Sequence, residues 1–138
     1  MAELTVSHRY AFPAETLFDA WLDPQVARRF LFATPTGEMI RADVDARVGG
    51  RFALVDRRPD MGDVLHEGEY LEIDRPRRLL FTFAVPQFNP ASTTVALNIE
   101  PVKGGCEVTL THSGVRPEWA ERTQEGWGTI LANLEAAI

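Results

Sequence analysis

Two histidines and a tyrosine are the side chains best suited to chemistry on a bound molecule. His66 and Tyr70 lie in one segment of alternating polar and apolar residues, and His112 ends another. Because an imidazole titrates near neutral pH, either histidine could orient a polar group of a ligand or carry a proton. The other interpretation is a structural histidine, hydrogen-bonded within the protein as buried polar groups usually are. The sequence leaves both interpretations open and favours the structural one.

The other polar residues form no catalytic or metal-binding motif. Glu67 and Glu69 are two residues apart, which places both on the strand face that we expect to meet water. Cys106 and Ser113 are not surrounded by a nucleophile motif. The three histidines of the chain are scattered and lack the spacing of metal ligands. We therefore predict no catalytic residue, no metal site and no cofactor.

A series of β-strands must position the candidate side chains. Residues of alternating character predict strands at Leu4–Phe12, Met39–Asp45, Arg51–Val55, Val64–Ile73, Leu79–Val85, Thr93–Glu100 and Cys106–His112. The paired glycines in Val48–Arg51 predict a tight hairpin, and the break in alternation at Leu71–Ile73 predicts a bulge. Loops are expected at Asp56–Asp63 and at Pro86–Ser92, the latter placed to cover a cavity mouth.

The alternation also predicts which side chains point inward. With Glu67 and Glu69 in water, His66, Gly68 and Tyr70 face the interior. The remaining inward residues on the later strands are Leu79, Phe81, Phe83, Val95, Leu97, Ile99, Val108, Leu110 and His112. Together they would form a wide apolar floor.

Helical periodicity appears before and after the strands. Two short helices are predicted within residues 13–32, and a long one opens at Pro117 and reaches Ile138. Gly126 and Gly128 flank Trp127 in that helix, and each costs about 1 kcal/mol relative to alanine. We expect either tight packing against the sheet or room for a ligand to offset this cost. The predicted fold class is α+β, one domain over residues 1–138 with the last helix across an antiparallel sheet.

Composition narrows the function classes. The chain has 138 residues and a net charge of −6, which disfavours nucleic acid as a partner because a polyanion needs a basic surface. There is one cysteine, and neither a secretion signal nor an apolar run long enough to span a bilayer is apparent. We therefore expect a cytoplasmic protein with no membrane insertion.

Five segments, in order along some 130 residues, resemble a known superfamily. They are PAETLFDAWLDP with ARRF, DVDARVGGRFAL, EGEYLEIDRPRRLLFTF, VTLTHSG and EGWGTILANLE. This pattern is similar to the SRPBCC or START-like superfamily. Within it, the chain most resembles the branch named for the C-terminal domain of the activator of heat-shock protein 90 ATPase. The resemblance implies a helix-grip fold with a hydrophobic cavity between the sheet and the final helix, where relatives bind apolar molecules and a few catalyse cyclisation or dehydration.

The leading hypothesis is therefore a non-catalytic protein that binds a small apolar or aromatic molecule. The expected cavity walls are Trp21, Phe30, His66, Tyr70, Phe81, Phe83, His112, Trp127 and Leu131. The first alternative is a cyclase or dehydratase in which His66, Tyr70 or His112 acts as acid or base. The second is an interaction module that associates with a chaperone or with a second copy of itself as a homodimer.

Overall fold

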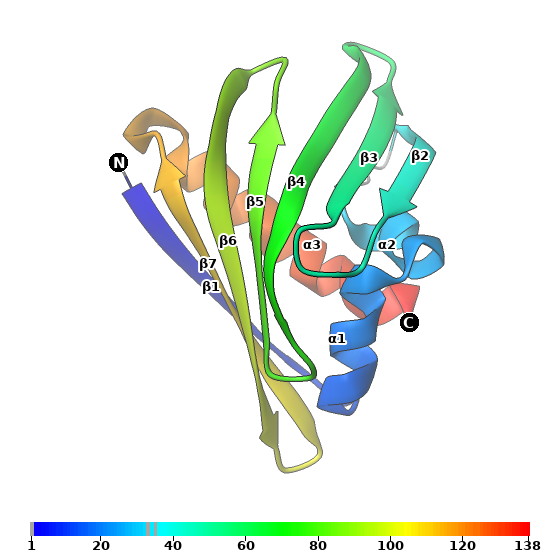
Figure 1. Ribbon diagram of the computed structural model, residues 1–138, viewed down its shortest axis with the longest axis vertical. Coiled ribbons are helices and arrows are strands. Elements are labelled where there is room, and N and C mark those ends of the chain that lie inside the picture. The colour runs from blue at the N-terminus through cyan, green and yellow to red at the C-terminus, as the bar shows by residue number, and fades with distance from the viewer. Residues whose placement is uncertain (1, 33, 35) are drawn as a thin grey trace.

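Seven antiparallel strands form the body of the protein (Figure 1). The structure is a computed structural model that describes residues 2–32, 34 and 36–138. The strands are β1 (Ala2–Tyr10), β2 (Glu38–Val44), β3 (Arg51–Arg58), β4 (Gly62–Asp74), β5 (Arg78–Val85), β6 (Asn89–Val102) and β7 (Gly105–Val115). Their order across the sheet is β1-β7-β6-β5-β4-β3-β2. The first and second strands of the chain are thus the two edges of the sheet.

The helices lie on one face of the curved sheet, as the α+β prediction requires. The helices are α1 (Ala14–Leu22), α2 (Pro24–Phe30), the 3-10 turn η1 (Pro117–Trp119) and α3 (Ala120–Ala137). In Figure 1 the long helix α3 crosses behind the strands, from the end of β7 toward α2. The predicted helix-grip arrangement is confirmed. No helix within the described residues is long and apolar enough to cross a membrane.

The predicted inward face is also confirmed. His66 and Tyr70 are buried on β4, while Glu67 and Glu69 beside them are partly exposed. The inward residues of β5, β6 and β7 are buried as well, except Phe83, which stays partly exposed. The register of β4 against β5 shifts between Tyr70 and Glu72, where the bulge is predicted.

Three turn predictions need correction. The connection at Val48–Arg51 is no tight hairpin, because residues 45–50 form a longer loop in which Gly49 donates to the Tyr70 carbonyl at 2.8 Å. The predicted loops 56–63 and 86–92 are shorter than expected, since β3 continues to Arg58 and β6 already begins at Asn89. The end of β3 tolerates polar residues because each has a partner: Asp56 is buried against Arg58, and Arg57 pairs across the strands with Asp63 on the exposed side.

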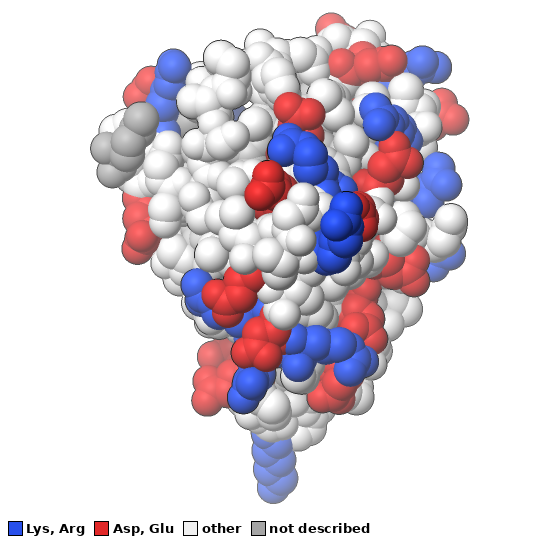
Figure 2. All heavy atoms as spheres, viewed as in Figure 1, with Lys and Arg blue, Asp and Glu red and all other residues white. Residues whose placement is uncertain are grey.

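The outward face of the sheet carries charges of both signs. Figure 2 shows basic and acidic side chains interleaved over this face, without a single-sign patch. Neighbouring strands form ion pairs there, such as Arg51–Glu69 and Arg78–Glu72. Such pairs between exposed groups are weak and leave this face ordinary solvated surface.

The glycines of α3 differ from the expectation. A methyl group added at Gly126 or Gly128 would meet nothing within 4 Å beyond its chain neighbours and the backbone of its own helix. Neither residue packs tightly against the sheet, so close packing does not offset their helix-breaking tendency. By contrast, a methyl group at Gly68 on β4 would lie 1.8 Å from the Thr82 carbonyl oxygen. Of these three positions, only Gly68 lies so close to the neighbouring strand that a side chain would not fit.

Alanine substitution should therefore have opposite effects at these positions. We expect Gly126→Ala and Gly128→Ala each to raise the free energy of unfolding by about 0.5 to 1 kcal/mol, because alanine favours the helix. Gly68→Ala should lower it by at least about 2 kcal/mol, because strand backbone must move. Urea denaturation of the three variants measures both effects. Destabilisation by either helix substitution would show that the glycines have a role that open space does not explain.

Candidate functional site

Aromatic side chains fill most of the space between the sheet and the helices α1 and α2. Trp21 meets Phe30 edge-on with ring centroids 5.3 Å apart, and Phe81 meets Phe52 in the same way at 5.4 Å. The void left between the sheet and α1 is about 10 Å³, which holds no more than one water molecule. Its lining includes Trp21, Tyr70 and Phe81. This part of the interior is packed core.

A second aromatic cluster lies under the middle of α3, and Phe32 is at its centre. The Phe32 ring stacks on His66 at 4.4 Å, stacks on Phe83 at 5.1 Å and meets Trp127 edge-on at 5.8 Å. Phe32 has a φ of 61°, which is rare for a bulky residue and costs about 1 to 2 kcal/mol. The backbone conformation after α2 thus turns this ring inward, where its packing offsets the strain.

A chain of hydrogen bonds joins this cluster to the sheet. The indole N–H of Trp127 donates to Nδ1 of His112 at 2.9 Å. Because Nδ1 accepts, the neutral ring carries its proton on Nε2 and donates to Thr93 Oγ1 at 2.7 Å. The Thr93 hydroxyl in turn donates to the Phe83 carbonyl at 3.0 Å. This relay, from Trp127 through His112 and Thr93 to Phe83, links α3 to β7, β6 and β5.

Both inward histidines are held neutral by burial. Desolvation lowers the pKa of His112 to about 4. Desolvation, assisted by the nearby charge of Arg58, also lowers the pKa of His66 to about 4. His66 differs in that its Nδ1 has no hydrogen-bond partner among the described residues. The structural interpretation fits His112, whose two ring nitrogens are both occupied.

A much larger pocket lies beyond this relay, at the N-terminal end of α3. Its volume is about 610 Å³. The walls come from the β3–β4 and β5–β6 hairpins, the end of β7, η1 and the first turn of α3. The lining residues are Arg58, Met61, Phe83, Ala84, Val85, Gln87, Phe88, Asn89, Ala91, Thr93, His112, Gly114, Val115, Arg116, Trp119, Arg122 and Thr123.

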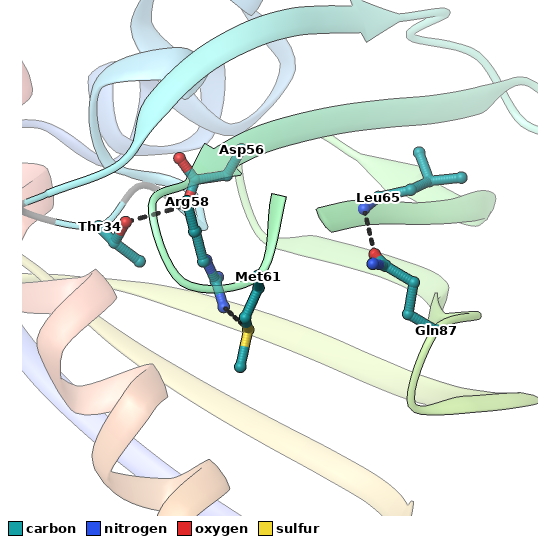
Figure 3. Close-up of polar contacts among 6 residues, drawn as sticks. All are labelled: Thr34, Asp56, Arg58, Met61, Leu65 and Gln87. Carbon is teal, nitrogen blue, oxygen red and sulfur yellow. Dashed lines mark hydrogen bonds and ion pairs between the residues drawn. The ribbon is translucent and has the colours of Figure 1, made fainter. Parts of the chain in front are cut away.

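Divergence of β4 from β5 shapes one wall of this pocket. The two strands are paired from Asp74–Arg78 as far as Glu67–Ala84, and no pairing continues beyond that point. The Leu65 backbone N–H instead donates to the Gln87 side-chain oxygen at 3.2 Å (Figure 3). A side chain therefore replaces the backbone ladder where the sheet opens.

A buried carboxylate supports the opposite wall. Asp56 is fully buried on β3, where it accepts hydrogen bonds from Arg58 Nε at 2.9 Å and Thr34 Oγ1 at 3.0 Å (Figure 3). Arg58 also reaches the Met61 sulfur at 3.9 Å, which fixes its guanidinium along the pocket wall. The sequence did not indicate this arrangement, because Asp56 is in a segment predicted to be a loop.

The predicted site residues do not share one cavity. Phe83 and His112 line the 610 Å³ pocket, whereas Trp21, Tyr70 and Phe81 line the small void. His66 and Trp127 pack behind the pocket floor, Phe30 packs on Trp21, and Leu131 is buried with its carbonyl bound by the Tyr10 hydroxyl at 2.6 Å.

Other lining residues were missed or only partly anticipated. Trp119, Val115 and the arginines lie in segments that sequence periodicity did not mark as a site. The expected loop over a cavity mouth is the one usable signal, since Gln87, Phe88, Asn89 and Ala91 all line the pocket.

The candidate acid–base residues do not share one cavity. Tyr70 lines the small void, His112 lines the pocket, and His66 lines neither. Burial also raises the pKa of Tyr70 far above its usual value, so its hydroxyl stays protonated. Within the described residues, no group of three or more His, Cys, Asp or Glu side chains could hold a metal ion.

Comparisons with known proteins agree on the fold. The family described as "Activator of Hsp90 ATPase homolog 1-like protein" matches residues 11–138. Protein CV1439 from Chromobacterium violaceum is 22% identical with a TM-score of 0.87, over 97% of this chain and 94% of that one. An AHSA1-like protein from Aeromonas hydrophila is 23% identical with a TM-score of 0.85, over 99% and 91%. CalU16 from Micromonospora echinospora is 23% identical with a TM-score of 0.72, over 98% and 74%. No curated protein matches the chain.

The buried neutral histidines predict a loss of stability in mild acid. Their folded-state pKa values of about 4 lie below the unfolded value of about 6.5, so the unfolded chain binds more protons between these limits. The free energy of unfolding should therefore decrease as the pH is lowered, by about 1 to 2 kcal/mol per histidine between pH 7 and pH 5. Denaturation at pH 7 and pH 5 measures this loss.

His66→Phe tests the assignment. Its ring can keep the stack on Phe32, and no hydrogen bond of Nδ1 is lost. We expect the variant to lose about half as much stability as the original protein between the two pH values. Equal losses in both proteins would contradict the assignment to His66.

Proposed function

The chain belongs to the activator of Hsp90 ATPase homolog 1-like family, and from that premise we propose that it binds a small apolar or aromatic molecule without transforming it. The 610 Å³ pocket at the N-terminal end of α3 is the proposed site. Pockets for small molecules commonly measure about 300 to 1,000 Å³. The contrast with the 10 Å³ void is the observation that carries the proposal, since only one of the two spaces can admit a ligand.

The chemistry of the walls supports an apolar ligand. Phe83, Val85, Val115 and Trp119 contribute apolar surface to the lining. A ligand that covers such surface gains about 25 cal/mol per Å² removed from water. Few polar groups are needed in such a site, because burial supplies affinity and the polar groups supply orientation.

Two exposed apolar side chains mark the mouth of the pocket. Met61, next to the β3–β4 turn, is 49% exposed, and Phe88 at the β5–β6 turn is 51% exposed. Both hairpins project at the same end of the sheet in Figure 1. Apolar residues gathered around a concave opening are typical of a ligand entrance rather than of ordinary surface.

The floor of the pocket is rigid before any ligand arrives. His112 and Thr93 are fixed by the relay, and Trp127 packs against Phe83 at 5.9 Å. A preformed floor reduces the entropy lost when a ligand binds. The hydrogen bonds of the relay also disfavour the cyclase or dehydratase alternative. Both nitrogens of His112 are used in them, so neither is free to exchange a proton with a substrate.

A substitution that fills the pocket tests the proposal. Thr123 on α3 is half-buried and lines the pocket. We expect N-phenyl-1-naphthylamine, a neutral fluorescent aromatic, to bind the unaltered protein with micromolar affinity. Thr123→Phe should weaken that binding by about tenfold or more, because the added ring occupies the ligand's volume.

Thr129→Phe is the matched control. Thr129 is exposed on the same helix, away from the pocket, so its substitution should leave the affinity unchanged. Fluorescence titration of the three proteins gives the comparison, and urea denaturation checks that each is folded. Absence of probe binding to the unaltered protein, or equal affinity in all three, would overturn the proposal.

A further inference from the structure

We propose that the pocket selects amphipathic anions, namely small molecules with an apolar body and one carboxylate, and that Arg116 and Arg122 hold the carboxylate at the rim. This inference rests on the proposed binding function and specifies the class of ligand. It is carried by the charges of the lining residues, by the state of each arginine and by the lack of free donors on the pocket floor.

The charge of the lining is opposite to that of the protein. The chain has 20 acidic and 14 basic residues. The pocket lining nevertheless contains three arginines and no aspartate or glutamate. Glu118 and Glu121 lie on the same segment as the arginines, yet neither lines the pocket. The charged side chains that line this pocket are therefore all basic.

One of the three arginines is already neutralised. Arg58 Nε lies 2.9 Å from the Asp56 carboxylate, which is fully buried, so the two charges cancel within the wall. Arg116 and Arg122 form no ion pair with any described residue. They are the two cations of the pocket that remain available to an anion.

Both available arginines are positioned at the opening. Arg116 lies just before η1, with its guanidinium carbon 4.8 Å from the centre of the Trp119 ring. This stacking against a lining residue holds the guanidinium on the pocket wall. Arg122 is in the first turn of α3, and both arginines are exposed. Guanidinium groups favour carboxylates because two parallel N–H donors match the two oxygens.

The floor determines which end of the ligand enters first. Each ring nitrogen of His112 and the hydroxyl proton of Thr93 are used within the relay. A carboxylate placed there would lose its water without gaining a donor, at a cost of several kcal/mol. The apolar body therefore packs on Phe83 and the carboxylate remains at the rim. The net charge of −6 disfavours polyanions, which leaves a monoanion as the best match.

A pair of probes that differ only in the head group tests the inference. Decanoate and decanol compete with N-phenyl-1-naphthylamine in a fluorescence displacement assay at neutral pH. At about 20 mM salt we expect decanoate to bind about three- to tenfold more tightly than decanol. The preference should shrink in about 500 mM salt, where charge interactions are screened. The double variant R116Q/R122Q should lose the preference and retain the decanol affinity.

A control variant separates local from overall charge. R41Q/R47Q also removes two positive charges, from exposed arginines outside the pocket, and should keep the preference for decanoate. Equal affinity for the two probes in the unaltered protein would overturn the anion selectivity while leaving the proposed binding function standing. A preference that persists in R116Q/R122Q would overturn the assignment to these arginines. Failure of all three molecules to bind would overturn the binding function itself.

Discussion

The hydrogen-bond relay from Trp127 to the Phe83 carbonyl is the constraint on which the arrangement of this protein depends. It connects α3 with β7, β6 and β5, through groups that are largely shielded from water. An unpaired polar group in that environment costs about 1 to 3 kcal/mol, so loss of one group of the relay would leave its neighbour without a hydrogen-bond partner. The donor direction of an indole N–H is fixed by its ring, so the relay holds Trp127 in place above β7, while the Tyr10 hydroxyl of β1 binds the Leu131 carbonyl farther along α3.

The space on the helical side of the sheet is divided into two unequal parts. On one side, Trp21, Phe30 and Phe81 fill the interior and leave only a small void. On the other, β4 leaves β5 and the Gln87 side chain spans the separation, which keeps the pocket open without exposing a bare strand edge. A filled core at one end supplies the stability that an open pocket at the other end cannot contribute.

Sequence periodicity predicted the sheet well because burial of one face imposes a period of two on every strand. His66 and Tyr70 were placed on the inner face for that reason alone, and helical periodicity predicted the last helix across the sheet. The site was harder to predict. Periodicity indicates which side chains are buried, but it does not indicate whether they pack against one another or line a cavity. The inward turn of Phe32 depends on a left-handed backbone conformation that its sequence does not signal. Asp56 was predicted to lie in a loop because it is polar, whereas in the structure it is buried and forms an ion pair with Arg58.

The division between core and pocket explains why this fold by itself does not determine a ligand. Solved structures that share it are only 14–23% identical to this chain, so the fold persists through extensive change of sequence. The pocket rim has different constraints: Arg116 and Arg122 are exposed, and neither contributes to the buried core. Substitution at such positions costs little stability, whereas substitution in the relay disrupts the packing of α3. Under the proposed binding function, ligand choice can therefore change at the rim while the relay and the core stay constant.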